Sequence, residues 1–350
     1  MKHLNYFLIL SVSFFGCKKN DGVIIDPGKY IFPIPQVDLT EDARVGAYYS
    51  VYTTTDWAVA KPFTPLLGNY DANTATVMQQ HLKWADTAGV NFFAFRWNGT
   101  TNNTTLANFK TQAATSNVKM VIDYNTAHLS ATNASPLIGA KLTTFANEWR
   151  TLITTYVNNQ STYYKIDNRP VVMLSPLNLS TATSTSINYK LVVDTLRNVM
   201  SSFGLNPFII GELTTGWVAP INYPDSVLKA MDGIVLTTWS TTDYDRKFAF
   251  YSYSDLNYQN WKKTLEAWNV DYVPCIFPGW NNPSTLTQYV IARSDSNYTS
   301  YCNIAKRSMG KNRIIMINSW NDFQKGNTLE PAVEYGSDYL YITKRELKKK

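Results

Sequence analysis

Eight short runs rich in β-branched and aromatic residues alternate with longer helical patterns, and this alternation restricts the fold more than any other feature of the sequence. Strands joined by helices in this number close into a ring of parallel strands. The sequence therefore predicts an α/β fold of a single domain, a (β/α)8 TIM barrel. The runs are VGAYY (45–49), NFFAFRW (91–97), KMVIDY (119–124), PVVML (170–174), PFIIGEL (207–213), DGIVLTTW (232–239), YVPCIF (272–277) and RIIMIN (313–318).

The segments between these runs carry signals for the ends of helices. Residues 73–89 have Asn73 as a capping residue and Gly89 as a stop, and residues 187–204 stop at Gly204 in the same way. An open, doubly wound sheet is the competing fold. No glycine-rich phosphate loop follows the first run, which favours the barrel.

The first seventeen residues have the pattern of an export signal. Lys2 precedes an apolar run from Tyr6 that is too short for a membrane span, and Gly16 precedes Cys17. This Gly-Cys junction resembles a bacterial lipoprotein signal, in which the cysteine is lipidated, and a signal peptide without a lipid is the alternative. We therefore expect a protein of the bacterial envelope, lipid-anchored at Cys17 to the outer membrane and facing the periplasm or the cell surface.

Residues 18–43 mix charge, glycine and proline without a helical period, so we expect a tether there. The barrel domain should span 44–340, followed by a basic tail at 341–350. The formal net charge is +6, and five basic residues against Glu346 give the last seven residues +4 of it. No basic stripe runs through the body of the chain, so the sequence predicts no nucleic-acid partner.

Tryptophans gather at one end of the predicted strands. Six of the ten end or follow a strand at its carboxyl end, where a barrel places its active site. Indole faces stack on sugar rings, and nearby Tyr, Asn and Arg side chains hydrogen-bond hydroxyl groups, so this rim predicts a carbohydrate cleft. Aromatic packing that plugs the barrel mouth is the alternative. The six are Trp57, Trp97, Trp217, Trp239, Trp280 and Trp320.

Three acidic residues, Asp123, Glu212 and Asp322, lie at the same strand ends. Glycoside cleavage needs two carboxyl groups flanking the bond, one to protonate the leaving oxygen and one to attack or to activate a nucleophile. We therefore expect catalytic residues among these three. Strand-end acids also pair with bases such as Arg96 or bind backbone amides, which is the structural alternative for each.

Other chemistries have little support in the sequence. Only His81 and His128 lie beyond the signal region, and the chain has no HExxH, CxxC or Walker motif, so we expect neither a metal nor a cofactor. His81 is interpreted as a helix-face residue, whereas His128 either reaches the cleft or stays in a surface loop. Cys275 and Cys302 either pair in an oxidising compartment or remain buried free thiols.

The stretch NSWNDFQKGNTLEP (318–331) resembles the last-strand motif of the glycoside hydrolase family 99-like barrels, including the related WbsX-type glycosyltransferase domains. The segments VGAYYSVYTTTDW (45–57) and HLKWADTAGVNFFAFRW (81–97) are also similar to that family, and the likeness spans roughly residues 44–334. It implies a barrel that processes glycans. The matching motif residues are Asn321, Gly326, Leu329, Glu330 and Pro331.

The resemblance also implies roles for two positions of the motif. In that family its first glutamate acts on the sugar's 2-hydroxyl and its second serves as acid and base, and this chain has Asp322 and Lys325 at those places. An ammonium does not replace a carboxyl group that gives and takes a proton. We therefore expect Lys325 to pair with Asp322, Glu212 to supply the acid, and Glu330 to anchor the loop.

Two functions follow from these observations. The first is an exported glycoside hydrolase acting on a polysaccharide or a glycoprotein glycan, and the second is a glycan-binding protein on a decayed hydrolase barrel, favoured by Lys325. A glycosyltransferase is a third hypothesis, but it needs a sugar-nucleotide donor and the chain has no phosphate-binding loop. The residues expected to contact the glycan are Tyr49, Arg96, Trp97, Asn98, Tyr124, Trp239, Trp280, Asn318, Trp320, Asn321 and Lys325.

Overall fold

The computed structural model describes residues 31–100, 102–177, 186–213, 225–237, 249–284 and 290–350. Its main sheet runs in the order β8-β7-β6-β5-β3-β2-β1-β10-β9, and every neighbouring pair on this path is parallel. The strands are β1 (Arg44–Tyr49), β2 (Phe92–Trp97), β3 (Lys119–Asn125), β5 (Arg169–Leu177), β6 (Phe208–Leu213), β7 (Gly233–Leu236), β8 (Asp271–Val273), β9 (Cys275–Ile276) and β10 (Ile314–Ile317). A short strand, β4 (Lys165–Ile166), pairs antiparallel with β5.

The ring closes through β8 and β9, which are the two halves of the seventh predicted run. β8 pairs with β7, whereas β9 pairs with β10, and Pro274 separates them. Proline has no N–H to donate to a ladder. Its carbonyl oxygen still accepts a hydrogen bond from Met316 N at 2.9 Å, so this segment bridges the two flanking strands. The predicted (β/α)8 barrel is therefore confirmed.

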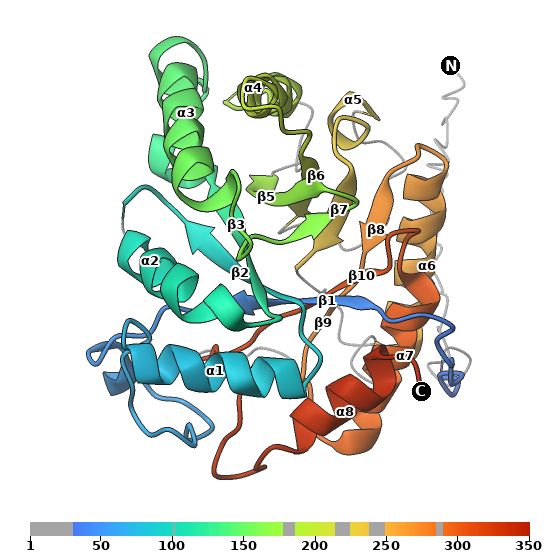
Figure 1. Cartoon of the computed structure of the whole chain (residues 1–350). Coiled ribbons are helices and arrows are strands. Elements are labelled where there is room, and N and C mark those ends of the chain that lie inside the picture. The colour runs from blue at the N-terminus through green and yellow to red at the C-terminus, as the bar shows by residue number, and fades with distance from the viewer. Residues whose placement is uncertain (1–30, 101, 178–185, 214–224, 238–248, 285–289) are drawn as a thin grey trace, which may run out of the picture.

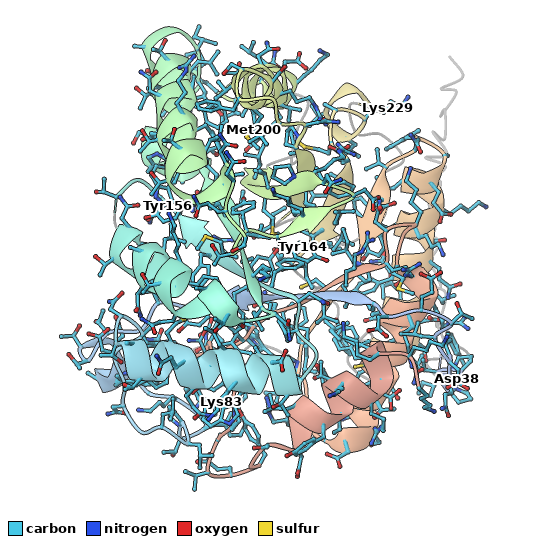
Figure 2. All side chains as sticks on the ribbon, viewed as in Figure 1. Asp38, Lys83, Tyr156, Tyr164, Met200 and Lys229 are labelled. Atoms are coloured by element: carbon cyan, nitrogen blue, oxygen red, sulfur yellow. The ribbon has the colours of Figure 1, made fainter. Side chains whose placement is uncertain are left out.

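Helices surround the ring, and the first strand, β1, lies beside the last, β10 (Figure 1). Side chains fill the ring and the layer between strands and helices (Figure 2). The first helix begins at Ala75 after Thr74, so Asn73 is not its cap, and the Asn73 Oδ1 atom accepts a hydrogen bond from Thr105 instead. The helices are α1 (Ala75–Thr87), α2 (Asn103–Gln112), α3 (Gly139–Leu152), α4 (Tyr189–Ser201), α5 (Asp225–Leu228), α6 (Phe250–Glu266), α7 (Asp295–Ser308) and α8 (Asp338–Leu347).

Side chains alternate between the inside of the ring and the helix layer along each strand, as the pleat requires. Gly46 faces inward, because a Cβ atom there would lie 2.2 Å from the ring of Phe92 and 2.6 Å from Met316 Sδ. Tyr49 faces outward, and its ring packs edge-on against His81 of α1. Two adjacent residues at a strand end therefore do not both point into the barrel.

The ends of the domain differ from the prediction. Residues 31–43, expected as part of a tether, pack on the barrel: Ser252 bonds both the N–H and the carbonyl of Phe32 at 3.0 Å, and Asn303 accepts from Val37 N at 2.9 Å. The expected basic tail mostly belongs to α8, in which Leu347 is fully buried. The amphipathic spacing of apolar residues within this basic segment would have predicted a helix there.

Two further observations concern the compartment of the protein. Cys275 and Cys302 are buried and unpaired, which agrees with the free-thiol alternative. None of the helices within the described ranges is long and apolar enough to cross a membrane. Cys17 and the rest of the expected signal segment lie outside the described residues.

Candidate active site

A cavity of about 540 Å³ opens at the carboxyl ends of the barrel strands. β1, β2, β6 and the segments after β7, β9 and β10 contribute its walls. This is the end at which barrels of this type hold their active sites. Of the residues predicted to act there, those that border it are Arg96, Asn98, Glu212, Trp280, Asn318, Asp322 and Lys325. Tyr49 also borders it, although its side chain points out to His81 of α1.

Several residues predicted for the site do not border the cavity. Most of them point away from it because side chains alternate between the two sides of a strand. Trp97 follows the inward-facing Arg96, so it turns to the helix layer, where it packs against Tyr124. Tyr124 in turn follows Asp123 and stacks on Trp149 of α3. Neither aromatic side chain is placed to contact a ligand in the barrel mouth.

The tryptophan rim is mostly packing in the described part of the chain. Trp57 and Trp320 are buried, with Trp320 fully enclosed against Phe93 and His81. The expected sugar contact of Trp320 is therefore corrected to a core position. Trp280 alone of the described rim tryptophans borders the cavity. Trp217 and Trp239 lie outside the described residues.

Arg96 joins two of the three predicted catalytic acids. Its Nε atom donates to Asp123 Oδ2 at 2.9 Å, and its Nη2 atom lies 2.8 Å from both carboxylate oxygens of Glu212. Thr237 Oγ1 donates to Glu212 Oε1 at 3.2 Å. Asp123 is fully buried behind Arg96 and does not border the cavity, so its position suits charge balance rather than contact with substrate.

The surroundings of Glu212 change its proton affinity. Burial first, and then the nearby Asp123 charge, raise the pKa of Glu212 to about 7 against the opposing effect of Arg96. The same two carboxylates, Asp123 first, raise the pKa of Arg96 above its ordinary value. Glu212 therefore carries its proton over part of the neutral range, as a general acid requires.

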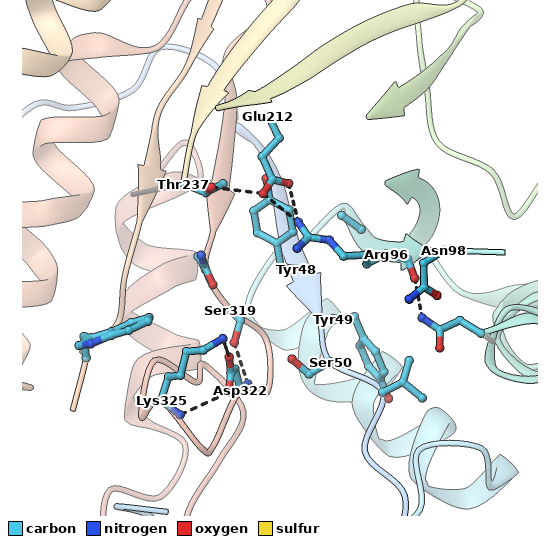
Figure 3. Close-up of a pocket in the computed structure, with 15 residues that line it drawn as sticks. Tyr48, Tyr49, Ser50, Arg96, Asn98, Glu212, Thr237, Ser319, Asp322 and Lys325 are labelled. Carbon is cyan, nitrogen blue, oxygen red and sulfur yellow. Dashed lines mark hydrogen bonds and ion pairs between the residues drawn. The ribbon is translucent and has the colours of Figure 1, made fainter. Parts of the chain in front are cut away.

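Asp322 forms the second charged group of the cavity. Lys325 Nζ lies 2.9 Å from Asp322 Oδ2, which confirms the predicted ion pair. Tyr52 donates its hydroxyl to Asp322 Oδ1 at 3.3 Å, and Ser319 Oγ accepts from Asp322 N at 2.7 Å. Figure 3 shows the two charged groups as separate sets, Glu212 with Arg96 and Asp322 with Lys325.

The loop after β10 is fastened by buried residues of the motif. Asn321 accepts from Ser50 N at 2.7 Å and donates to Ser50 O at 2.9 Å, so it pins the loop to the end of β1 and does not border the cavity. Glu330 is fully buried, accepts a 2.7 Å hydrogen bond from Tyr70, and lies 3.2 Å from His81 Nε2. The anchoring role expected for Glu330 agrees with these contacts.

The charged residues differ in how far they reach solvent. The Arg96 and Lys325 side chains are 46% and 48% exposed, whereas those of Asp322 and Glu212 are 13% and 3% exposed. Both cations are therefore more exposed than the carboxylates that they bond.

Sequence reasoning missed several residues that line the cavity. Tyr48 borders it from β1, and its hydroxyl is buried close enough to Glu212 for that charge to contribute, after burial, to a raised Tyr48 pKa. Thr237 borders it from the end of β7. The alternation of side chains along a strand could have identified Tyr48. Tyr48 lies two residues after the inward-facing Gly46, whereas the predicted Tyr49 lies on the opposite side of the strand.

Neither of the two described histidines, His81 and His128, borders the cavity. His81 is buried between Tyr49 and Glu330, and His128 bonds Glu148 at 3.1 Å on the helix side, away from the cavity lining. Within the described ranges, no cluster of three or more His, Cys, Asp or Glu side chains is arranged to hold a metal ion.

The fold and the site define a parallel (β/α)8 barrel with two carboxyl groups, those of Glu212 and Asp322, in the cavity at the carboxyl ends of its strands. The model of the family described as Glycosyltransferase WbsX matches residues 59–343. The chain therefore belongs to this WbsX family.

Two solved structures share this fold. A protein described as glycoside hydrolase-like superposes with a TM-score of 0.81 at 23% identity, covering 93% of this chain and 99% of that one. The GH99 endo-alpha-mannosidase of Bacteroides thetaiotaomicron superposes with a TM-score of 0.64 at 17% identity, covering 88% and 97%. No curated protein sequence matches the chain.

Proposed function

We propose that this protein is an exported, surface-anchored glycoside hydrolase that cleaves a polysaccharide or a glycoprotein glycan at the barrel mouth. The observation that carries the proposal is the placement of Asp322 and Glu212 in one cavity at the carboxyl ends of the strands. The glycoside hydrolase-like neighbours support it, and the family, described as a glycosyltransferase family, supports a glycan as the ligand. Export and lipidation at Cys17 depend on the sequence of residues 1–17.

The two carboxyl groups suit different steps of glycoside cleavage. Glu212, whose pKa burial raises to about 7, donates its proton to the leaving oxygen. Asp322, whose negative charge the Lys325 ammonium stabilises, attacks the anomeric carbon or activates the attacking group. Arg96 covers Glu212, so a substrate oxygen displaces one of these contacts when it receives the proton.

A glycan-binding protein without catalysis is the second candidate. The observation that favours it is that each carboxyl group of the cavity is already bonded to a cation, Glu212 to Arg96 and Asp322 to Lys325. Such pairs keep the carboxyl groups from the reacting bond unless the substrate breaks them. Both candidate functions use the same cavity. Only the hydrolase would cleave the glycan that it binds.

Release of reducing sugar separates the two candidates. We would assay the chain beginning at Ile31 on a panel of polysaccharides, together with Asp322→Asn and Glu212→Gln, and measure binding in the same samples. Asp194→Asn is the matched control, because Asp194 forms an exposed ion pair with Lys190 on α4. Release that is lost in the two cavity variants while binding persists supports the hydrolase, and tight binding without release in any form supports the binding protein.

A further inference from the structure

The order of charges in the cavity points to the kind of sugar that it holds. Among the charged residues described in the cavity, Arg96 and Lys325 are the ones open to a ligand, because their side chains are about half exposed while the carboxylates that they bond are nearly covered. Arginine and lysine bond sugar hydroxyl groups as well, but only an anionic group adds charge-assisted hydrogen bonds with them. The arrangement therefore favours a ligand with negative charge.

Both cations have donors to spare after their contacts within the protein. Arg96 uses Nε and Nη2 for Asp123 and Glu212, and Nη1 makes no hydrogen bond within the described part of the chain. Lys325 uses one N–H for Asp322, at 2.9 Å, and an ammonium carries three. The two buried acids fix the guanidinium plane of Arg96, so the free nitrogen is already oriented before a ligand arrives.

An aromatic platform lies next to one of these cations. Lys325 Nζ is 6.0 Å from the centre of the Trp280 ring, and both residues border the cavity. A sugar ring that stacks on the indole of Trp280 brings its substituents toward the ammonium. The amides of Asn98, Asn102 and Asn318 also border the cavity and suit the remaining hydroxyl groups.

We infer that the glycan bound in this cavity is acidic, with a carboxylate or a sulfate ester on the sugar that stacks on Trp280, and that Lys325 and Arg96 recognise this anionic group. The inference deepens the proposed function, and it takes from it only that the ligand is a glycan. Charge-assisted hydrogen bonds of this kind are about twice as strong as neutral ones. Lys325 thus becomes a specificity residue at a position where the resembled family motif has a glutamate.

Binding measured by calorimetry tests the inference with four defined probes. These are an oligogalacturonate, a chondroitin sulfate oligosaccharide, a manno-oligosaccharide of equal length, and UDP-glucose. At low salt we expect one of the two acidic oligosaccharides to bind at least about tenfold more tightly than the neutral one, a difference of about 1.4 kcal/mol. Comparison of the galacturonate with the sulfated probe shows which anionic group the site prefers. Added salt should weaken the acidic ligand only.

Two variants connect this preference to the cavity. Lys325→Gln should reduce affinity for the acidic ligand by about fivefold or more and reduce neutral affinity by less, as expected for loss of one charge-assisted contact. Lys190→Gln removes another exposed, paired lysine, on α4, and should change neither. A Lys325 variant that binds the acidic probe as well as the parent protein does overturns the inference.

The remaining outcomes separate this inference from the proposed hydrolase. Neutral mannan bound as tightly as the acidic probes and cleaved overturns the inference and leaves the hydrolase in place. An acidic glycan bound but never cleaved overturns the hydrolase and supports the inference. UDP-glucose bound more tightly than either acidic oligosaccharide overturns both, because the cations then serve a sugar-nucleotide diphosphate. Binding of none of the four probes also overturns the inference.

Discussion

The Lys325 ammonium lies 2.9 Å from Asp322 Oδ2, on the loop that follows the last strand of the barrel. Lys325 is about half exposed, so water screens much of this attraction. Measured contributions of such pairs to stability are about 0–1 kcal/mol. The pair therefore organises charge in the cavity and adds little to the stability of the fold.

The first prediction concerns the stability of this pair. Lys325→Gln should lower the free energy of unfolding by less than about 1 kcal/mol, because the partner keeps its contacts with Tyr52 and the loop backbone. Urea denaturation at low and high salt measures the change, which should shrink as salt rises. A loss of several kcal/mol would instead make the pair a structural element of the barrel.

The second prediction is that kcat/KM falls as pH rises on the alkaline side of its pH profile. Glu212 donates a proton only in its acid form, and its pKa is raised to about 7. On a glycan that the protein cleaves, kcat/KM should therefore decline about tenfold per pH unit above this value, and Glu212→Gln should remove this decline with the activity. A profile that stays level to pH 9 in the parent protein would remove Glu212 from the acid role.

The raised pKa of Glu212 also makes the stability of the fold depend on pH. The direction of this dependence is opposite to that of a carboxylate whose pKa is lowered by folding. Between the ordinary value of 4.5 and about 7, the folded protein holds the Glu212 proton while the unfolded chain releases it. The folded state therefore binds more protons, and the contribution of this residue to stability falls as pH rises through that window. Thermal unfolding of the parent and Glu212→Gln proteins across pH 4.5–7 should show this slope in the parent only.

The number of strands and their ends were predictable from the sequence. The prediction did not separate the residues that point into the barrel from those that point toward the helices. The eight runs fix where each strand ends, which placed Arg96, Glu212 and Asp322 at the mouth. Period-2 alternation would also have excluded Trp97 and selected Tyr48. Composition alone does not show which way an aromatic side chain at a strand end points. Such a residue serves equally as a sugar platform or as packing against a helix.

Packing of the chain ends was hidden for a different reason. Residues 31–43 carry no repeat that marks a helix or strand, since their backbone is held by Ser252 and Asn303 more than two hundred residues away. Contacts this remote in sequence leave no local pattern. The burial of Glu330, by contrast, was predictable from its place in the family motif.

The third prediction contrasts two tryptophans from the same predicted rim. Trp320→Ala removes a fully enclosed indole and should cost about 3–5 kcal/mol of stability. Trp280→Ala should cost less stability, because its ring is only partly buried, and should weaken glycan binding by about 1–2 kcal/mol, because the residue borders the cavity. Chemical denaturation and calorimetry separate the two effects. Equal stability losses in both variants would place Trp280 in the core as well.

The fourth prediction concerns the buried network beneath the loop. Glu330→Ala leaves the Tyr70 hydroxyl without its 2.7 Å acceptor and removes the contact with His81, so we expect a loss of about 3–5 kcal/mol. Below its melting temperature the variant should bind glycan as the parent does, since Glu330 does not border the cavity. Full stability with lost binding would assign Glu330 a direct role in the site.

The last prediction tests whether the domain begins at Ile31 or at Arg44. A chain that starts at Arg44 loses the backbone partners of Ser252 and Asn303, both of which are buried side chains. Each lost hydrogen bond contributes about 0.5–1.5 kcal/mol, and the truncation also uncovers apolar surface against which Ile34 and Leu39 pack. The shorter chain should therefore unfold several degrees lower than the chain from Ile31. Ser252→Ala in the longer chain is the matched control, because it removes one partner without exposing the surface beneath. Equal melting temperatures for the two chains would return residues 31–43 to the role of a tether.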